Sequence, residues 1–222
     1  MEKRGLLYVL EGPDFFGKDT QMEMLSERLK KEGYPLVVTR EPGSEHEKIC
    51  GKIRELLLDT KNDGMTSMTE MFLYLADRAQ HTQKVIKPAL DSGKIVLTSR
   101  YRYSTEVYQG MVRGLGLERA KMLNDIVTEG TSPDRIVFLD GDPAEVYGNR
   151  GVETLDRIER EGLPFQIKVR DGYRQIAKDL KNVKVVSFLY GKRDEMHEQI
   201  YRFFKEHLDK HAGDTFLETF QT

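Results

Sequence analysis

Residues 12–20 read Gly-Pro-Asp-Phe-Phe-Gly-Lys-Asp-Thr and place two glycines and a lysine at the spacing G-x-x-x-x-G-K. Such glycines let backbone N–H groups converge on phosphate oxygens, and a helix that follows directs its positive end at the same anion. The lysine adds a point charge for the outer phosphates. The apolar run Leu6–Leu10 precedes the loop, and Met22, Leu25 and Leu29 follow it at helical spacing. The segment therefore predicts a phosphate-binding loop between a strand and a helix.

The last position of this loop departs from the usual pattern. Where Ser or Thr normally offers a hydroxyl to Mg²⁺, this chain has Asp19, and Thr20 comes one position too late to face the same way. Either Asp19 binds the metal through its carboxylate or the site has lost its metal. Oxygen ligands suit Mg²⁺, so a carboxylate is chemically acceptable there.

The elements that must position this loop alternate along the chain. Short apolar runs predict five strands, at Leu6–Leu10, Leu36–Val38, Ile95–Leu97, Ile136–Leu139 and Val183–Val186. Apolar residues at helical spacing predict helices between and after them, near residues 22–33, 49–57, 68–79, 85–90, 106–112, 117–127 and 195–208. Strands that alternate with helices predict an α/β fold with a mainly parallel sheet.

Length and composition limit the remaining options. The chain has 222 residues, which suits a single domain, and we assign it to residues 1–210. Residues 150–163 are rich in arginine, glycine and acids and predict a mobile lid, whereas residues 211–222 lack clear periodicity and predict a loose tail.

Charge and cysteine content exclude several classes of protein. Lys plus Arg number 35 and Asp plus Glu 37, so a general nucleic-acid binder with a basic surface is not expected. The first apolar run is too short for a signal peptide or a membrane span. Cys50 is the only cysteine, so no intrachain disulfide can form and a reducing compartment is expected. We therefore expect a cytoplasmic protein with no membrane association.

Several segments after the loop resemble motifs of one family, the thymidylate kinases. Residues 39–43 (Thr-Arg-Glu-Pro-Gly) resemble its R-E-P-G segment, and residues 53–58 its I-R-x-L-L motif. Residues 74–81 (Tyr-Leu-Ala-Asp-Arg-Ala-Gln-His) resemble F-A-A-D-R-A-Q-H, with Tyr in place of Phe. Residues 99–110 resemble D-R-Y-x-x-S-x-x-A-Y-Q-G, and residues 155–159 the lid motif L-D-R-x-E. The resemblance runs in order from about Leu6 to Tyr173.

The resemblance implies a P-loop NTPase fold and transfer of the terminal phosphoryl group of ATP to dTMP, giving dTDP and ADP with Mg²⁺. It also implies a homodimer. The ATP-binding residues it implies are Gly12, Phe15, Phe16, Gly17, Lys18, Asp19 and Thr20. The dTMP-binding residues it implies are Asp14, Glu41, Pro42, Arg54, Tyr74, Arg78, Arg100, Thr105, Tyr108 and Gln109.

The resemblance also assigns roles on the acceptor side. Asp14 is expected to accept from the deoxyribose 3'-hydroxyl, and Arg54 and Arg100 to hold the 5'-phosphate through their forked guanidinium groups. Tyr74 is expected to stack on thymine. Arg78 lies four residues later, on the same helical face, and is expected to bond the base carbonyl.

Catalysis is expected to rest on Lys18, Arg100 and lid arginines. Residues 15 and 16 are phenylalanines, so the loop lacks the basic residue that some relatives carry there. The resemblance then places the catalytic arginine in the lid, where Arg150 and Arg157 are the candidates, with Arg160 nearby.

Two departures from the family pattern fall on the expected metal site. The D-R-Y aspartate, which helps to hold Mg²⁺, is Ser99 here, and the loop hydroxyl is Asp19. The carboxylate and the hydroxyl have exchanged places. We interpret this as compensation, with both groups still beside the metal, and independent loss of both ligands is the competing interpretation. A working metal site would indicate a thymidylate kinase, or a kinase of another deoxynucleoside monophosphate; a broken one would indicate a nucleotide-binding homologue without turnover.

Overall fold

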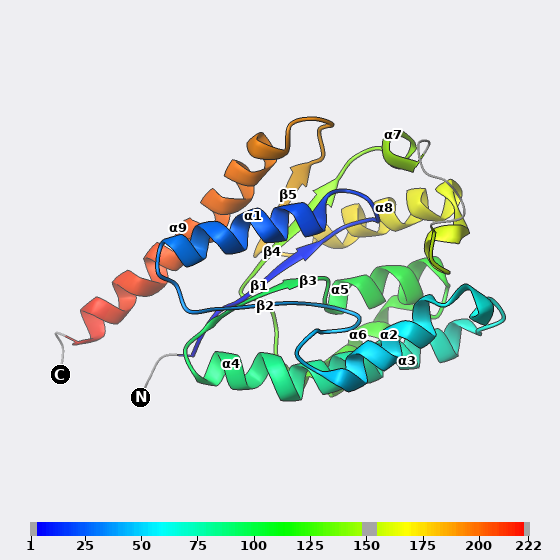
Figure 1. The fold of residues 1–222 in the computed structure, drawn as a ribbon, viewed down its shortest axis with the longest axis horizontal. Coiled ribbons are helices and arrows are strands. Elements are labelled where there is room, and N and C mark those ends of the chain that lie inside the picture. The colour runs from blue at the N-terminus through cyan, green and yellow to red at the C-terminus, as the bar shows by residue number, and fades with distance from the viewer. Residues whose placement is uncertain (1–3, 148–154, 220–222) are drawn as a thin grey trace.

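A five-stranded parallel sheet forms the centre of the molecule, in the order β2-β3-β1-β4-β5. The computed structural model describes residues 4–147 and 155–219. The strands are β1 (Leu7–Glu11), β2 (Leu36–Arg40), β3 (Ile95–Ser99), β4 (Arg135–Asp140) and β5 (Val183–Ser187). Each predicted strand is confirmed, and every pairing is parallel. Figure 1 shows the strands side by side with helices above and below them.

The strand order brings the loops of interest to one edge of the sheet. β1 lies between β3 and β4, and Leu10 pairs with Ser99 in register. On the other side of β3, Ser99 also pairs with Arg40. The chain reverses its strand order on either side of β1, and ligands of open parallel sheets bind outside the carboxyl ends of the strands at such a point.

Helices connect the strands and cover both faces. They are α1 (Lys18–Lys31), α2 (Lys48–Leu58), α3 (Ser67–His81), α4 (Lys87–Asp91), α5 (Arg102–Thr105), α6 (Leu117–Thr128), α7 (Pro143–Tyr147), α8 (Leu163–Ala177) and α9 (Arg193–Thr219). Short 3₁₀ turns lie at η1 (Thr60–Asn62) and η5 (Glu159–Glu161), and π-helical turns at η2 (Thr82–Ile86) and η3 (Glu106–Val112).

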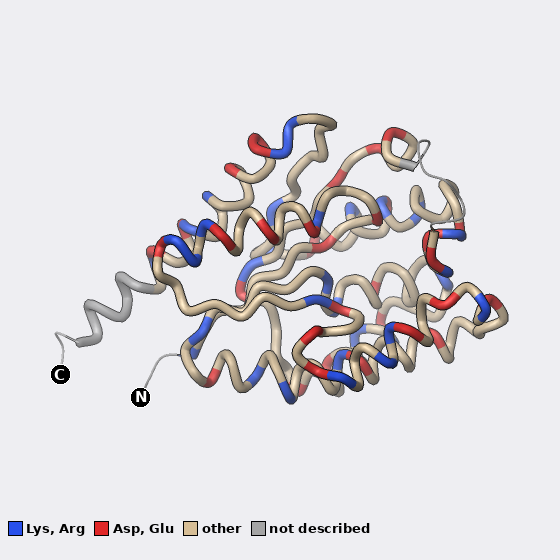
Figure 2. Tube along the Cα trace, in the orientation of Figure 1, with Lys and Arg blue, Asp and Glu red and all other residues tan. Residues whose placement is uncertain are grey.

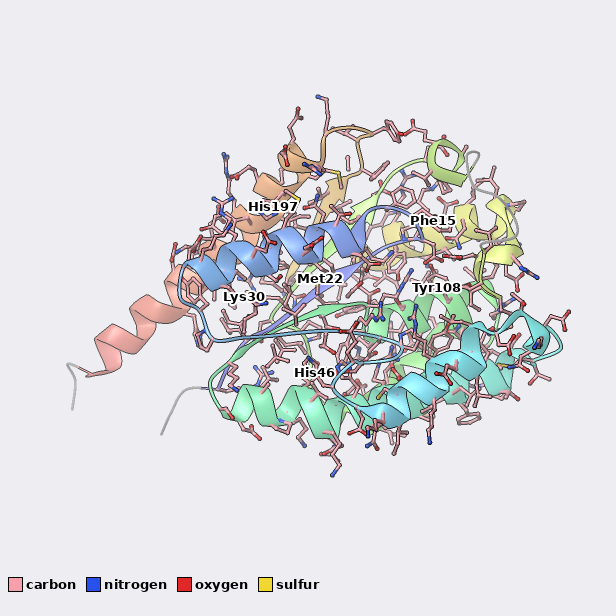
Figure 3. All side chains as sticks on the ribbon, viewed as in Figure 1. Phe15, Met22, Lys30, His46, Tyr108 and His197 are labelled. Carbon is pink, nitrogen blue, oxygen red and sulfur yellow. The ribbon has the colours of Figure 1, made fainter. Side chains whose placement is uncertain are left out.

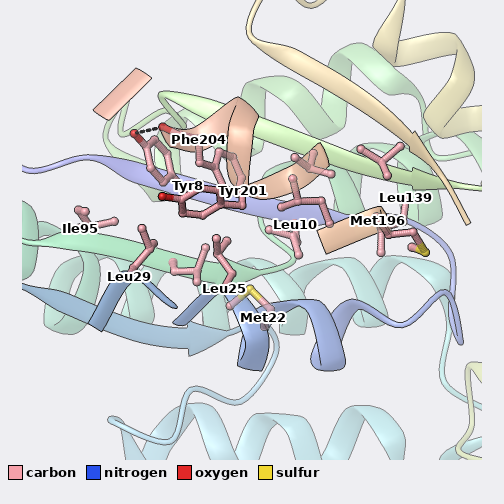
Figure 4. Packing of buried hydrophobic residues seen from close by; sticks show 14 of the residues in the cluster. Tyr8, Leu10, Met22, Leu25, Leu29, Ile95, Leu139, Met196, Tyr201 and Phe204 are labelled. Atoms are coloured by element: carbon pink, nitrogen blue, oxygen red, sulfur yellow. Dashed lines mark hydrogen bonds between the residues drawn. The ribbon is translucent and has the colours of Figure 1, made fainter. Parts of the chain in front are cut away.

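One face of the sheet packs against α1 and α9. Tyr8 and Leu10 point to this side, and they meet Leu25 of α1 and Phe204 of α9 in one buried cluster (Figure 4). The Tyr8 and Phe204 rings stack with centroids 4.5 Å apart. Successive strand residues point to opposite faces, so Leu7 and Val9 pack on the other side.

The opposite face packs against α4, η3 and α8. Val9 meets Leu90 of α4, while Phe138 of β4 meets Val107 of η3 and Tyr173 of α8. Residues on β1 and β3 are buried on both sides, which explains why these strands read as continuous apolar runs.

Two boundaries differ from the sequence prediction. The helices expected near residues 68–79 and 85–90 form one continuous run from Ser67 to Asp91, joined by the π-helical turn η2. The last helix was expected to end near Leu208 and continues to Thr219, through most of the segment predicted as a loose tail. The described part of the expected lid, from Leu155 on, is anchored by the buried side chains of Leu155, Arg157 and Ile158.

The surface carries charges of both signs. Lys and Arg are interspersed with Asp and Glu over the described part of the chain (Figure 2). Among the described residues, no helix is both long and apolar enough to cross a membrane.

Candidate active site

A cavity of about 410 Å³ opens where β1, β2 and β3 end. Figure 3 shows Phe15 of the loop and Tyr108 of η3 at this same end of the molecule. The residues around the cavity come from the phosphate loop, the turn after β2, the end of β3, the helices that follow and the lid. They include Asp14, Phe15, Gly17, Lys18, Asp19, Thr20, Arg40, Glu41, Pro42, Arg54, Tyr74, Ser99, Arg100, Tyr108, Gln109, Asp156 and Glu159.

The backbone of the phosphate loop requires its glycines. Gly12 has φ +140, and a Cβ there would lie 2.6 Å from the carbonyl oxygen of Leu139. Gly17 adopts the left-handed conformation with φ +73, directly before α1 begins at Lys18. Phe15 also has a positive φ, a conformation that costs a non-glycine residue energy and that clusters at ligand sites. The loop thus directs the amino end of α1 into the cavity, as the motif predicts.

The Lys18 ammonium folds back onto its own loop. Its Nζ donates to the carbonyl oxygens of Gly12, at 3.0 Å, and Pro13. Burial, together with the nearby Arg100 guanidinium, lowers the pKa of Lys18 to about 7. An anion in the cavity would oppose this shift because it favours the charged amine.

Asp14 and Arg100 form an ion pair at the centre of the site. Asp14 also accepts from the Tyr108 hydroxyl at 3.1 Å and the Gln166 amide at 3.0 Å. Burial alone would raise the pKa of Asp14, but Arg100 and Lys18 outweigh it and lower that pKa below its ordinary value. Arg100 has φ +65, so its backbone is held in a strained conformation at the end of β3.

A second carboxylate, Glu11, lies beneath this pair. It is fully buried and accepts from the backbone N–H and hydroxyl of Ser104, the N–H of Tyr101 and the Tyr173 hydroxyl. The Ser104 hydroxyl contact is 2.6 Å. Burial raises the pKa of Glu11. Glu11 therefore fixes the start of the helix α5 that follows Arg100, and the sequence motif gave no sign of this role.

The acceptor side of the cavity combines an arginine, an aromatic ring and an amide. Arg54 of α2 donates to the carbonyl oxygen of Pro42 at 2.9 Å. Burial, followed by repulsion from Arg40, lowers the pKa of Arg54. Tyr74 and Gln109 line the same cavity, and the Gln109 amide donates to Glu70 at 2.8 Å.

Arg78 lies behind the wall of this cavity, in a buried network. It donates to Glu41 at 2.8 Å, to Thr105 at 2.7 Å, to Asn124 at 2.9 Å and to the carbonyl oxygen of Tyr101 at 2.8 Å. Arg78 and Thr105 are each 1% exposed. The sequence predicts that both residues contact the base. In the structure Arg78 contacts Glu41 and Thr105, because the carboxylate that follows β2 offers a buried guanidinium its charge partner. Their contact with dTMP stays a prediction.

The lid arginine Arg157 is also paired internally. Its Nη1 lies 2.8 Å from Glu70 of α3, and its Nε donates to the carbonyl oxygen of Leu57 at 2.7 Å. It does not line the cavity in this conformation. The other lid candidate, Arg150, lies outside the described residues. Catalysis by either arginine stays a prediction.

The two exchanged residues of the expected metal site, Asp19 and Ser99, both line the cavity beside Lys18. Asp19 is exposed at the start of α1, and Ser99 is buried at the end of β3. Among the described residues no group of three or more His, Cys, Asp and Glu side chains is gathered for a metal. Mg²⁺ uses one or two protein oxygens and completes its shell with water and substrate phosphates, so this sparse donor set fits it.

A second cavity, of about 610 Å³, adjoins the first along α1. Gly17 and Thr20 border both cavities, and Phe188, Leu189 and Met196 supply apolar surface on the far side. Of the remaining sequence-predicted residues, Gly12 and Phe16 line neither of these two cavities; Phe16 is buried in the core against Phe188.

The sequence is similar to known proteins of one family over most of its length. The sequence profile of the thymidylate kinase family matches residues 10–200. The thymidylate kinase of Thermoanaerobacter sp. (strain X514) is 42% identical over 207 residues, which is 92% of this chain and all of the relative. That of Caldanaerobacter subterraneus subsp. tengcongensis is 46% identical over 176 residues, 79% of this chain and 83% of the relative.

A solved structure of the same family is similar to this chain in fold. The crystal structure of thymidylate kinase from Ehrlichia chaffeensis superposes with a TM-score of 0.74 at 29% identity, and the match covers 90% of this chain and 99% of that one. A phosphate loop, a parallel sheet with helices on both faces, and a family profile that spans most of the sequence lead to one assignment. The chain belongs to the thymidylate kinase family.

Proposed function

We propose that this protein transfers the terminal phosphoryl group of ATP to dTMP and releases dTDP and ADP. The observation that carries the proposal is the single cavity that joins the phosphate loop to Arg54, Tyr74 and Arg100. A kinase needs the donor and acceptor phosphates side by side, and this cavity offers cations to both. Family membership supports the same reaction.

On the acceptor side, Arg54 and Arg100 hold the 5'-phosphate, Asp14 takes the sugar hydroxyl, and Tyr74 and Gln109 contact the base. Within residues 4–147 and 155–219, Arg54 makes one hydrogen bond, to a carbonyl oxygen, so its remaining donors can serve a ligand. The acceptor phosphate is already anionic, so no general base is required. The protein's task is to position the two phosphates and to neutralise charge as it develops.

On the donor side, the amino end of α1 and Lys18 receive the phosphates of ATP. The second cavity, with its apolar surface beside Gly17, receives the purine base. Binding of the phosphates releases Lys18 from the carbonyl oxygens of its own loop, because a phosphate oxygen is the stronger partner for an ammonium group.

Mg²⁺ would be held by Asp19 and Ser99. When bound, it neutralises part of the charge on the transferring group. The exchange of carboxylate and hydroxyl is proposed to be compensated, because both side chains border the same cavity.

The deciding experiment measures ADP release from ATP and Mg²⁺ with dTMP, beside dUMP, dCMP, dGMP and UMP. Preferential turnover of dTMP would establish the proposal. Turnover of another acceptor would move the assignment to a related kinase. Nucleotide binding without any turnover would indicate that the exchange at Asp19 and Ser99 is a loss, and would favour a binding protein.

We propose that the protein is a homodimer built on α3 and α6. These neighbouring helices expose Phe72, Met122 and Ile126, which are 53%, 56% and 64% exposed in the single chain. Burying large apolar side chains of this kind is the main driving force of association. The mass in solution tests this face: Phe72→Glu should give monomers, while Tyr190→Glu, at an aromatic residue that is 80% exposed and far along the chain, should not. A cytoplasmic location stays a prediction.

A further inference from the structure

Glu70 of α3 supports the wall of the active-site cavity without lining it. It lies one helical turn before Tyr74, and only 1% of its surface is exposed. Its Oε1 accepts from the Gln109 amide Nε2 at 2.8 Å, and Gln109 does line the cavity. Glu70 therefore acts on a ligand in the cavity through the side chain of Gln109.

Two arginines hold the Glu70 carboxylate in place. Arg113, which directly follows η3, donates from Nε to Oε1 at 3.2 Å and from Nη2 to Oε2 at 3.1 Å. The Nη1 of Arg157 lies 2.8 Å from Oε2. Two parallel bonds from one guanidinium fix the plane of a carboxylate. The Oε1 of Glu70 is thus held facing Gln109.

The chemistry of a carboxylate decides how the Gln109 amide is turned. The oxygens of a carboxylate that is paired with guanidinium groups only accept hydrogen bonds, so they can bond the NH₂ corner of an amide and not its carbonyl corner. Reversing the amide would set its carbonyl oxygen against Glu70 and leave buried acceptors without a donor, which is costly. The corner turned away from Glu70 is therefore the carbonyl oxygen, and Gln109 offers an acceptor to the cavity.

Pyrimidine bases differ at the position that such an acceptor reads. Thymine carries a hydrogen on N3 and can donate, whereas N3 of cytosine is itself an acceptor. A site that would leave buried polar groups unpaired rejects a ligand strongly. We propose that Glu70 fixes the orientation of the Gln109 amide and so makes the acceptor site select thymine over cytosine. This assignment rests on the proposed function and adds a positioning residue to it.

The test is Glu70→Gln, which keeps the length of the side chain and adds a donor. The amide introduced at position 70 can keep its oxygen on the arginines and turn its NH₂ towards Gln109, which then reverses. Binding of dTMP and of dCMP is measured by calorimetry, without ATP. The ratio of the dCMP Kd to the dTMP Kd should fall roughly tenfold to a hundredfold from that of the unaltered protein.

Arg113→Lys is the matched control. It disturbs the same buried ion pair but leaves Glu70 able only to accept, so the ratio of the two Kd values should stay within about twofold of the unaltered protein. The double variant Glu70→Gln/Arg113→Gln removes one charge of each sign. It replaces Glu70→Gln if the single variant does not fold, and its ratio should fall in the same way. Thermal unfolding of each variant shows that it is folded.

Two results would overturn the assignment. Equal losses of dTMP and dCMP affinity in the folded variant would make Glu70 a structural residue. A ratio that falls as far in Arg113→Lys would assign the selectivity to the charge of the network and not to the orientation of the amide. Failure of the unaltered protein to bind dTMP would instead refute the proposed function, so the two failures are distinguishable.

Discussion

Asp77 occupies a position in α3 where a charge is costly. Its side chain is fully buried, its Oδ1 accepts from the backbone N–H of Gly43 at 3.0 Å, and its Oδ2 has no partner among the described residues. Burial, followed by the neighbouring Glu41 carboxylate, raises the pKa of Asp77 from 3.8 to about 6. His81 and the Gly43 N–H oppose the shift without cancelling it.

The shift sets the size and sign of a stability effect. The folded protein holds the Asp77 proton more tightly than the unfolded chain. The contribution of Asp77 to stability is therefore fully present below pH 3.8 and is lost as the pH rises through about 6. A difference of about two pKa units corresponds to roughly 3 kcal/mol once the carboxyl is fully ionised. The same linkage gives a loss of only about 1 kcal/mol near pH 4.5.

Asp77→Asn removes this titration and keeps the Oδ1 acceptor for Gly43. Protonated aspartate and asparagine are both neutral, so the two proteins should differ little at low pH. The variant should be more stable by about 1 kcal/mol near pH 4.5 and by roughly 3 kcal/mol near pH 7.5. Denaturant unfolding monitored by circular dichroism at both pH values measures the difference.

Asp63→Asn is the control because Asp63 is exposed. Its effect on the free energy of unfolding should stay within about 0.5 kcal/mol at both pH values. The reasoning is refuted if the advantage of Asp77→Asn does not grow with pH, or if the variant is less stable than the unaltered protein near pH 7.5.

Three further outcomes follow from the same structure. Asp19→Ser and Ser99→Asp should each lower kcat/KM, and the double variant should recover activity, with a coupling energy of roughly 0.5–3 kcal/mol between the two substitutions. Simple addition of the two losses would contradict compensation at the metal site. Glu70→Ala should lower the free energy of unfolding by about 3–5 kcal/mol, because it leaves buried Arg157 unpaired, whereas Glu118→Ala, at an exposed ion pair, should cost less than about 1 kcal/mol. The kcat/KM for ATP should fall as the pH rises above about 7, because the free protein then loses the Lys18 proton; a flat profile between about pH 6 and about pH 8.5 would argue against that assignment.

Much of the fold could be predicted from the sequence because its signals are local. Buried parallel strands are apolar on both faces, so runs such as Leu6–Leu10 identify them without any knowledge of their neighbours. The phosphate loop is equally local, since its glycines and lysine act within nine residues. The strand order is not local, and it depends on packing between segments far apart in the chain.

The active site shows the same division. Residues that line the cavity from the motifs, such as Arg54, Tyr74 and Arg100, were identified from their letters and spacing. Residues that hold these side chains in place were not identified from the sequence. Glu70 bonds Gln109, Arg113 and Arg157, and Gln166 bonds Asp14 across 152 positions of sequence. In the sequence alone, a buried carboxylate or amide cannot be told from a surface residue. The one signal for Glu70 was its position one helical turn before Tyr74.

Three polar residues of the α3 motif support the scaffold of the site. Asp77, Arg78 and His81 all point back to the turn at residues 41–43: Asp77 bonds Gly43, and the other two bond Glu41.

That turn in turn positions Arg54. The Pro42 carbonyl oxygen accepts from the Arg54 guanidinium, and the Arg54 side chain lies so close to Gly43 that a Cβ there would be 2.4 Å from its Cδ. Gly43 also has φ +86, which disfavours any other residue. The charged residues of α3 therefore act on the position of Arg54 through the turn at residues 41–43.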